Sequence, residues 1–227
     1  MVLLSGGLDS ATAAACAKRD GFDLIALTVV YGQRHERELD SALDVADAIG
    51  VLEHLVLKVP LDAIGASALT DRRIKVPRGR RASQMSKGIP ATYVPARNTV
   101  LLSLAGSLAE ARGASAIYIG ANAIDYSGYP DCRPEYLRAF ERALARGTKA
   151  GVEGHPIKVK APLLRKSKAD IVRLALRLKV PIELTWSCYL GGAVACGTCD
   201  SCLLRLKGFM EARKTDPVPY AIGPKRR

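Results

Sequence analysis

The stretch Met1-Val-Leu-Leu-Ser-Gly-Gly-Leu-Asp-Ser10 decides the fold. Its three apolar residues predict a buried strand, the two glycines predict a tight turn, and residues 11–18 are compatible with a helix. A strand, a glycine turn and a helix in this order direct backbone N–H groups and the positive end of a helix toward an anion. The stretch therefore predicts a phosphate-binding loop, in which the hydroxyls of Ser5 and Ser10 are additional donors.

This loop differs from two common nucleotide-binding loops. It lacks the lysine of a Walker A loop, which reaches the β- and γ-phosphates, and it lacks the Gly-x-Gly-x-x-Gly fingerprint of dinucleotide-binding folds. Residues 5–10, Ser-Gly-Gly-Leu-Asp-Ser, resemble instead the PP-loop of the ATP pyrophosphatase superfamily, whose members cleave ATP between the α- and β-phosphates and adenylate an oxygen. The resemblance implies an ATP site formed by Leu4, Ser5, Gly6, Gly7, Leu8, Asp9, Ser10, Ala11 and Thr12.

Strand and helix patterns alternate along the rest of the chain. Apolar strand patterns occupy residues 23–30, 53–59, 115–120 and 157–160, and helical patterns occupy residues 36–49, 98–112, 134–146 and 167–178. Asn98 and Ser167 are the predicted N-caps of two helices, and residues 60–90 are predicted to be irregular. The alternation predicts an α/β fold with a doubly wound parallel sheet. The resemblance to the PP-loop implies that this fold is Rossmann-like and of the adenine nucleotide alpha hydrolase type. Ligands of such sheets bind beyond the carboxyl ends of the strands, where residues 5–10, 31–35 and 121–133 are expected.

Length and composition predict one α/β domain with a C-terminal appendage. The chain has 227 residues, of which 48% are hydrophobic. We expect a PP-loop domain at 1–180, a C-terminal segment at 181–215, which the family resemblance given below implies is zinc-binding, and a basic tail at 216–227. The sequence contains no apolar run of membrane-spanning length and no visible signal peptide, and its predicted loop begins at Ser5. We therefore expect a cytoplasmic protein that does not contact membranes.

The net charge of +12 raises the question of a nucleic-acid partner. Basic residues concentrate at 71–81 and at 225–227, and such runs can bind phosphate backbones. They also occur as solvated loops and tails, and positive potential favours ATP. Because no stacking aromatics are interleaved with the basic run, nucleic acid is not an expected partner.

A cluster of cysteines is the second strong signal. Cys188, Cys196, Cys199 and Cys202 fall within fifteen residues, in a chain that we expect to be cytoplasmic, where disulfides are disfavoured. Four thiolates suit a closed, structural Zn²⁺ site, but a Cys-x2-Cys-x2-Cys run also occurs in iron–sulfur proteins. Spacing alone leaves both metals open. Cys16 is predicted to lie in the core.

Five motifs recur in one order and resemble a single family over nearly the whole chain. They are residues 5–10, Tyr31-Gly-Gln-Arg-His35, Tyr93-Val-Pro-Ala-Arg-Asn-Thr99, Asp125-Tyr-Ser-Gly-Tyr-Pro-Asp-Cys-Arg-Pro-Glu135 and Thr185-Trp-Ser-Cys-Tyr189. Together they resemble the 7-cyano-7-deazaguanine (preQ0) synthase family of queuosine and archaeosine precursor biosynthesis. In that family the four cysteines bind zinc, which implies one structural Zn²⁺ per chain here. Ala96 departs from the pattern, because many relatives have glycine there, and the basic segment 71–81 lies outside it.

The resemblance implies an ATP-dependent carbon–nitrogen ligase. Its reaction converts 7-carboxy-7-deazaguanine and ammonia to the 7-cyano compound through an adenylated carboxylate and an adenylated amide. The catalytic candidates are Asp9, placed near Mg²⁺, Arg97 and Lys168; the substrate-binding candidates are Asp125, Ser127, Asp131 and Arg133. Each has a plainer interpretation: Asp9 as a carboxylate at a helix N-terminus, Arg97 and Lys168 as solvated residues, and the others as turn formers.

Three alternatives remain open at this point. A PP-loop enzyme that modifies tRNA, such as a thiolase, would explain the positive charge, and a relative that couples the deazapurine to a protein amine would share the motifs. A zinc-bearing nucleotide sensor without turnover is the non-enzymatic alternative. The sequence is compatible with a homodimer and identifies neither the oligomeric state nor the source of ammonia.

Overall fold

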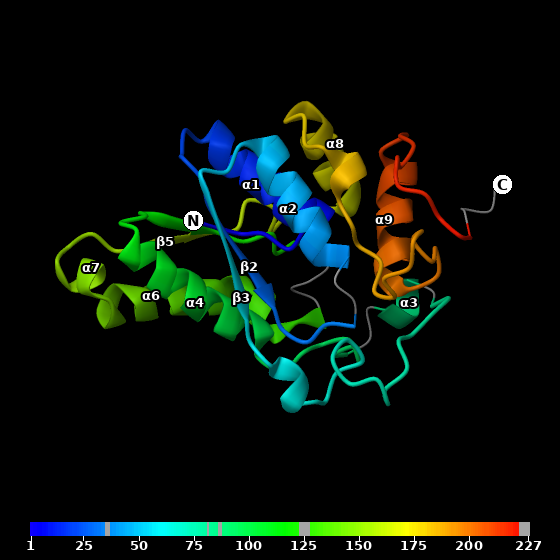
Figure 1. Cartoon of the computed structure of the whole chain (residues 1–227), viewed down its shortest axis with the longest axis horizontal. Helices are drawn as coiled ribbons and strands as arrows, with labels where there is room; N and C mark the ends of the chain where they lie inside the picture. The colour runs from blue at the N-terminus through cyan, green and yellow to red at the C-terminus, as the bar shows by residue number, and fades with distance from the viewer. Residues whose placement is uncertain (35–36, 81, 86–87, 123–127, 223–227) are drawn as a thin grey trace.

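The fold is built on a parallel sheet, as Figure 1 shows. The computed structural model describes residues 1–34, 37–80, 82–85, 88–122 and 128–222. Within them the sheet has five strands in the order β3-β2-β1-β4-β5, and every pair is parallel. The strands are β1 (Val2–Leu3), β2 (Ile25–Val30), β3 (Glu53–Lys58), β4 (Ala116–Tyr118) and β5 (Lys158–Lys160). The doubly wound parallel sheet predicted from the sequence is confirmed.

Helices cover both faces of this sheet (Figure 1). On one face lie α1 (Leu8–Arg19), α2 (Arg37–Ile49) and α8 (Lys168–Arg177); on the other lie α4 (Arg97–Ala111) and α6 (Pro134–Gly147). Because successive side chains of a strand point to opposite faces, Val2 joins the first core and Leu3 joins the second. Cys16 is fully buried in the first core, as predicted.

The connections place a ligand site at the end of β1. The chain leaves β1 toward β2 and β3 on one side, and returns to β4 and β5 on the other side. The strand order therefore reverses at β1, and the crevice beyond such a reversal is where open α/β sheets bind ligands. The loop that follows β1 is the predicted phosphate loop, at residues 5–10.

One predicted helix cap was wrong. Helix α4 begins at Arg97, and its N-cap is Ala96, whose φ of +50° lies in the left-handed region. Asn98 lies inside the helix: its side chain donates to Cys132 Sγ at 2.9 Å, and its backbone N–H donates to Asp131 Oδ2 at 2.9 Å. A carboxylate from a distant segment thus caps this helix end. The predicted cap Ser167 is confirmed, because it forms a reciprocal capping box with Asp170.

The remaining elements are short, apart from one helix near the C-terminus. The short ones are η1 (Leu61–Ala63), α3 (Ala82–Met85), η2 (Pro130–Cys132), α7 (Lys149–Val152) and η3 (Ile182–Leu184). Helix α9 (Asp200–Glu211), which the sequence analysis did not predict, starts directly after Cys199. No helix in the described part of the chain is both long and apolar enough to cross a membrane.

Residues 78–80 of the basic segment pack against the cysteine-bearing segment. Arg78 pairs with Cys199 in an antiparallel bridge, and Gly79 N donates to Thr198 O at 2.8 Å. Arg80 forms an ion pair with the buried Asp200 at the start of α9. Part of the positive charge in this segment is therefore neutralised by an ion pair within the protein. The side chain of Arg73, in contrast, is 89% exposed.

Candidate functional site

The phosphate loop packs so closely on α2 that Gly6 must be glycine. Its φ is +74°, and a Cβ at this position would lie 2.5 Å from Glu38 O and 2.6 Å from Ala42 N. The loop ends at Gly7, the N-cap of α1, where no side chain caps the helix. The first N–H groups of α1 are thus left for an anion, next to the hydroxyls of Ser5 and Ser10, which lie 3.1 Å apart.

A polar cluster converges on the carboxylate of Asp9, in the first turn of α1. Its Oδ2 accepts a hydrogen bond from Lys168 Nζ at 2.6 Å and another from Asn122 Nδ2 at 2.8 Å. Its Oδ1 is buried and has no hydrogen-bond partner among the described residues. The close approach requires a glycine after β4, because a Cβ on Gly120 would lie 2.9 Å from the backbone of Asp9. An orphaned oxygen beside a lysine suits a bound cation and phosphate oxygens.

These groups face a cavity of about 270 Å³. Its lining includes eight of the predicted site residues: Leu4, Ser5, Gly7, Leu8, Asp9, Ser10, Arg97 and Lys168. The other three predicted ATP residues lie behind this wall. Gly6 packs on α2, and Ala11 and Thr12 are fully buried within α1.

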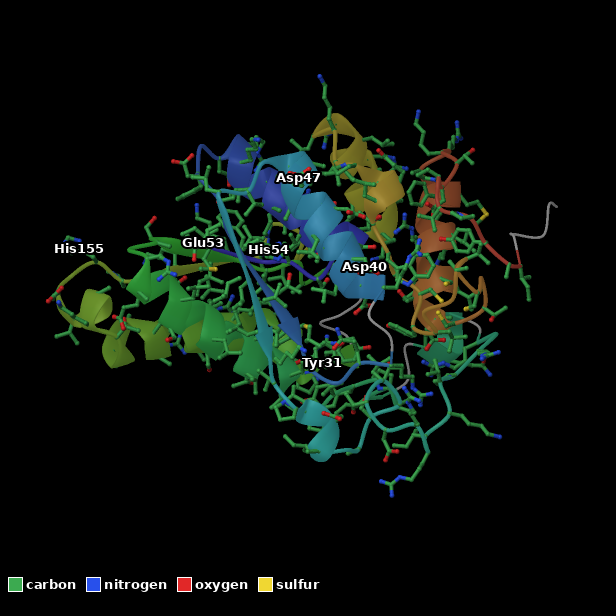
Figure 2. All side chains as sticks on the ribbon, in the orientation of Figure 1. Tyr31, Asp40, Asp47, Glu53, His54 and His155 are labelled. Atoms are coloured by element: carbon green, nitrogen blue, oxygen red, sulfur yellow. The ribbon has the colours of Figure 1, made fainter. Side chains whose placement is uncertain are left out.

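Arg97 also lines the cavity, from the first turn of α4. Its Nη1 donates to the hydroxyl of Tyr31 at 3.1 Å, and its guanidinium lies 5.4 Å from the centre of the tyrosine ring. Tyr31, labelled in Figure 2, lies just beyond the end of β2. Burial raises the pKa of Tyr31, so the phenol stays neutral and Arg97 keeps its full charge. The arginine is thereby held in position, with charge available toward the cavity.

The four cysteines form a compact sulfur cluster. Their Sγ atoms all lie within 4.8 Å of one another, and the Sγ atoms of Cys196 and Cys202 are 3.9 Å apart. Backbone N–H groups point at two of these sulfurs at 3.3–3.4 Å, from Leu190 and Cys196 to Cys188, and from Thr198 and Cys199 to Cys196. Such donors favour the thiolate form that metals require. The residues present therefore fit a metal ion.

Comparison with known proteins agrees with this geometry. The profile described as "Queuosine biosynthesis protein QueC" matches residues 1–213. The chain belongs to this family. A relative from Anaeromyxobacter dehalogenans (strain 2CP-C), named 7-cyano-7-deazaguanine synthase, is 57% identical over 97% of this chain and 95% of its own length. A relative of the same name from Thermosynechococcus vestitus (strain NIES-2133 / IAM M-273 / BP-1) is 52% identical over 99% and 96%.

One solved structure supports the fold. The NMN synthetase from Francisella tularensis superposes with a TM-score of 0.50 at 16% identity, covering 93% of this chain and 76% of that chain. At this identity the likeness concerns the fold, and it agrees with the parallel sheet described above.

The predicted substrate segment of this QueC-family chain is described only in part. Asp125 and Ser127 lie outside the described residues, as does His35. Asp131 is buried and caps α4, and Arg133 is exposed; neither lines the cavity. From the same segment, Tyr129 and Cys132 do line it.

Sequence reasoning missed three polar residues at the site: Asn122, Tyr31 and Glu38. Asn122 follows β4 and was hidden in a loop without a recognised motif, although it is 1% exposed. Tyr31 stands in a quoted motif, but nothing along the chain indicates that it contacts Arg97. Glu38 reads as an ordinary acidic residue in the first turn of a helix, and its position in the cavity wall follows from the contact between α2 and Gly6.

The sulfur cluster and the phosphate loop are joined through Trp186. Its backbone N–H donates to Gly6 O at 2.9 Å, and its indole Nε1 donates to Cys188 O at 3.1 Å. Arg205 of α9 forms a fully buried ion pair with Asp216 and donates to Thr185 Oγ1 at 2.8 Å. The C-terminal segment is thereby fixed against the loop.

Proposed function

We propose that this chain is a 7-cyano-7-deazaguanine synthase, which converts 7-carboxy-7-deazaguanine, ammonia and ATP into the nitrile with release of AMP and pyrophosphate. Membership of the QueC family and the names of its relatives support this assignment. The observation that carries it in the structure is the Asp9 cluster: a carboxylate with one oxygen unpaired among the described residues, held by Lys168 in the first turn of α1, a helix whose N-terminus no side chain caps.

The chemistry explains why such a loop is needed. A carboxylate resists amines because oxide is a poor leaving group. Transfer of AMP to that oxygen lets ammonia displace AMP and form an amide, and a second transfer to the amide oxygen lets AMP leave as the nitrile forms. A site that holds the α- and β-phosphates serves both activations, and residues 5–10 supply N–H and hydroxyl donors for them.

We assign roles to three charged residues. Lys168 balances the charge of Asp9 and reaches the β-phosphate side of the loop, and Arg97 stabilises charge that develops at the α-phosphorus. The unpaired Oδ1 of Asp9 is a suitable ligand for Mg²⁺, which would neutralise the phosphates when bound with ATP. Asp125, Ser127, Asp131 and Arg133 stay our candidates for holding the deazapurine.

We assign zinc to the sulfur cluster. A tetrahedral ion with Zn–S bonds of about 2.3 Å separates its sulfurs by about 3.8 Å, and the Cys196–Cys202 distance of 3.9 Å is close to this value. An iron–sulfur cubane places irons and sulfides between the thiolates and needs a wider arrangement. Zinc bound by Cys188, Cys196, Cys199 and Cys202 would have no open position, so its role is structural.

Further expectations accompany this function. We keep the division into an α/β domain at 1–180, a zinc-binding segment at 181–215 and a basic tail at 216–227, a cytoplasmic location, and a homodimer as the assembly to test. Residues 216–222 bear on the division, because Asp216 is buried with Arg205 and Ala221 N donates to Ala195 O at 2.8 Å. This part of the tail packs on the zinc-binding segment.

The product decides the function. Purified protein is incubated with 7-carboxy-7-deazaguanine, ATP, Mg²⁺ and ammonium, and the products are identified by mass spectrometry. We expect 7-cyano-7-deazaguanine, with AMP and pyrophosphate. Formation of ADP and phosphate, or the absence of any nitrile, would overturn the proposal.

Two control reactions separate the alternatives. Replacing ammonium with a protein amine tests conjugation of the deazapurine to protein, and replacing the deazapurine with tRNA tests tRNA modification. We expect neither to support ATP turnover. Turnover with one of them, and none with ammonium, would move the assignment to that class.

A further inference from the structure

Glu38 is a carboxylate in the cavity wall that the proposed function does not yet use. It stands in the first turn of α2, directly behind the phosphate loop, and lines the same cavity as Asp9 and Arg97. The cavity is lined by another acid, Asp9, which differs from Glu38 because it accepts hydrogen bonds from two protein side chains, Lys168 and Asn122. Among the described residues, Glu38 makes no side-chain hydrogen bond and no ion pair within 4 Å.

An acid without a partner in a partly buried wall is costly unless a ligand or a proton satisfies it. The contact that fixes α2 uses the backbone oxygen of Glu38, which Gly6 approaches. The side-chain carboxylate of Glu38 does not take part in that contact. It lines the cavity in which the adenylated substrate would lie, beyond the loop and near Arg97.

We propose that Glu38 is the base that deprotonates the incoming ammonium ion to ammonia; this inference rests on the proposed function. In the amide-forming step the nitrogen forms a bond to the carboxyl carbon, and the bond between that carbon and the adenylate oxygen breaks. Glu38 first takes one proton from the ammonium ion, AMP leaves with the electron pair of the broken bond, and the second proton that the nitrogen loses passes to the departing phosphate of AMP. The proton is later released to solvent through the cavity.

The electrostatic surroundings suit this role. Burial raises the pKa of Glu38 to about 7; Arg97 of α4 acts in the opposite direction, and Cys188 of the C-terminal segment adds to the increase. The dominant cause is burial, which does not depend on the charge state of the cysteines. The other charged or titratable groups that line the cavity are Asp9, Tyr31, Arg34, Tyr129, Cys132, Lys168, Tyr189 and Arg205. A base with a pKa near the working pH is deprotonated in a large fraction of the molecules, so it can accept a proton. It also releases that proton readily afterwards.

The test separates nucleophile activation from adenylation. Exchange of labelled pyrophosphate into ATP, with the carboxylate substrate and without ammonia, reports adenylation alone. We expect Glu38→Gln to keep this exchange within about twofold, and to lose amide formation from ammonium at neutral pH by about 10²-fold. The exposed Asp40 on the same helix, labelled in Figure 2, supplies the matched control Asp40→Asn, which should retain both activities.

A second nucleophile sharpens the result. Hydroxylamine is uncharged at neutral pH and needs less help from a base, so its reaction with the adenylate should survive in Glu38→Gln. Ammonium-dependent turnover of the variant should recover at alkaline pH, where free ammonia is abundant, and Glu38→Asp should retain part of the neutral activity.

Three outcomes would overturn the inference. Equal losses of exchange and amide formation would assign Glu38 to binding or folding, and unchanged amide formation would remove it from the mechanism. Equal losses with ammonium and hydroxylamine would exclude proton transfer from nitrogen. Failure of the proposed function is distinguishable, because the unaltered protein would then show no exchange that depends on the carboxylate.

Discussion

Helix α1, which begins at the phosphate loop, and helix α9, which begins at the cysteine cluster, start in the same way. Their first turns lie in different surroundings. Each follows a glycine-bearing loop, and each carries an aspartate in its first turn that pairs with a cation from a distant segment. Asp9 of α1 meets Lys168 and faces the cavity, whereas Asp200 of α9 meets Arg80 and is 5% exposed.

Access to ligand explains the different consequences of this shared arrangement. The Asp9–Lys168 pair lies in a cavity, so phosphates and a cation can rearrange it, and one oxygen of Asp9 is left without a protein partner. The Asp200–Arg80 pair joins the basic segment to the sulfur cluster, and its oxygens are directed at arginine. The first pair thus lines a cavity, whereas the aspartate of the second pair is buried within the protein.

The largest expected effect is on activity, at the first of these regions. Asp9→Asn should lower carboxylate-dependent pyrophosphate exchange by at least about 10²-fold, because the amide cannot supply the anionic oxygen that a cation and Lys168 require. Its circular dichroism spectrum and melting temperature should remain close to those of the unaltered protein. A variant with a lowered melting temperature and unchanged pyrophosphate exchange would contradict this expectation, because it would show that Asp9 serves stability rather than activity.

Metal removal should act on the second region and reduce stability. Metal analysis should find about one zinc per chain, and chelation or Cys199→Ser should lower the free energy of unfolding by more than about 3 kcal/mol, since binding energy of a structural metal is folding energy. Cys16→Ser, at a buried cysteine outside the cluster, is the control for loss of a thiol and should leave the zinc content unchanged. Iron with acid-labile sulfide, or an unchanged melting temperature after chelation, would contradict the assignment.

Asp200→Asn sharpens the comparison with Asp9→Asn, because the chemical change is identical. It removes a charge from the pair with Arg80, and we expect a loss of about 2 kcal/mol in the free energy of unfolding. Pyrophosphate exchange should be retained at temperatures where the variant is folded. A loss of exchange in the folded variant would show that the two regions are less separate than the structure indicates.

The smallest expected effect concerns Ala96, the N-cap of α4. Its positive φ of +50° disfavours alanine, so Ala96→Gly should raise the free energy of unfolding by about 0.5 kcal/mol in chemical denaturation. In the interior of α6 the same change at the exposed Ala139, Ala139→Gly, should instead lower it by about 1 kcal/mol. Destabilisation by both substitutions would show that strain at Ala96 is not significant.

The sequence predicted what is encoded locally. The alternating strands and helices, the Ser167 cap and the grouping of four cysteines depend on neighbouring residues, and the structure confirms them. The wrong cap at Asn98 has a non-local cause, because Asp131 supplies the carboxylate from another segment. Helix α9 was missed because its first turn overlaps the cysteine cluster, whose glycines and thiols obscure a helical pattern.

The polar residues of the site depend on the order of the strands. Asn122 meets Asp9 because β4 pairs with β1, and Tyr31 meets Arg97 because the ends of β2 and α4 converge at the same edge of the sheet. No periodicity along the chain specifies that order. Glu38 enters the cavity wall through the close packing of α2 on Gly6, a contact that appears only once the sheet is assembled.

The central claim is that the phosphate loop transfers AMP to the carboxylate oxygen, and the fate of that oxygen tests it most directly. The reaction is run with 7-carboxy-7-deazaguanine whose carboxyl oxygens are labelled with ¹⁸O, together with ATP, Mg²⁺ and ammonium, and AMP is analysed by mass spectrometry. The account predicts that the label is transferred from the carboxylate to the phosphate of AMP. Unlabelled AMP, or ADP in its place, would contradict it.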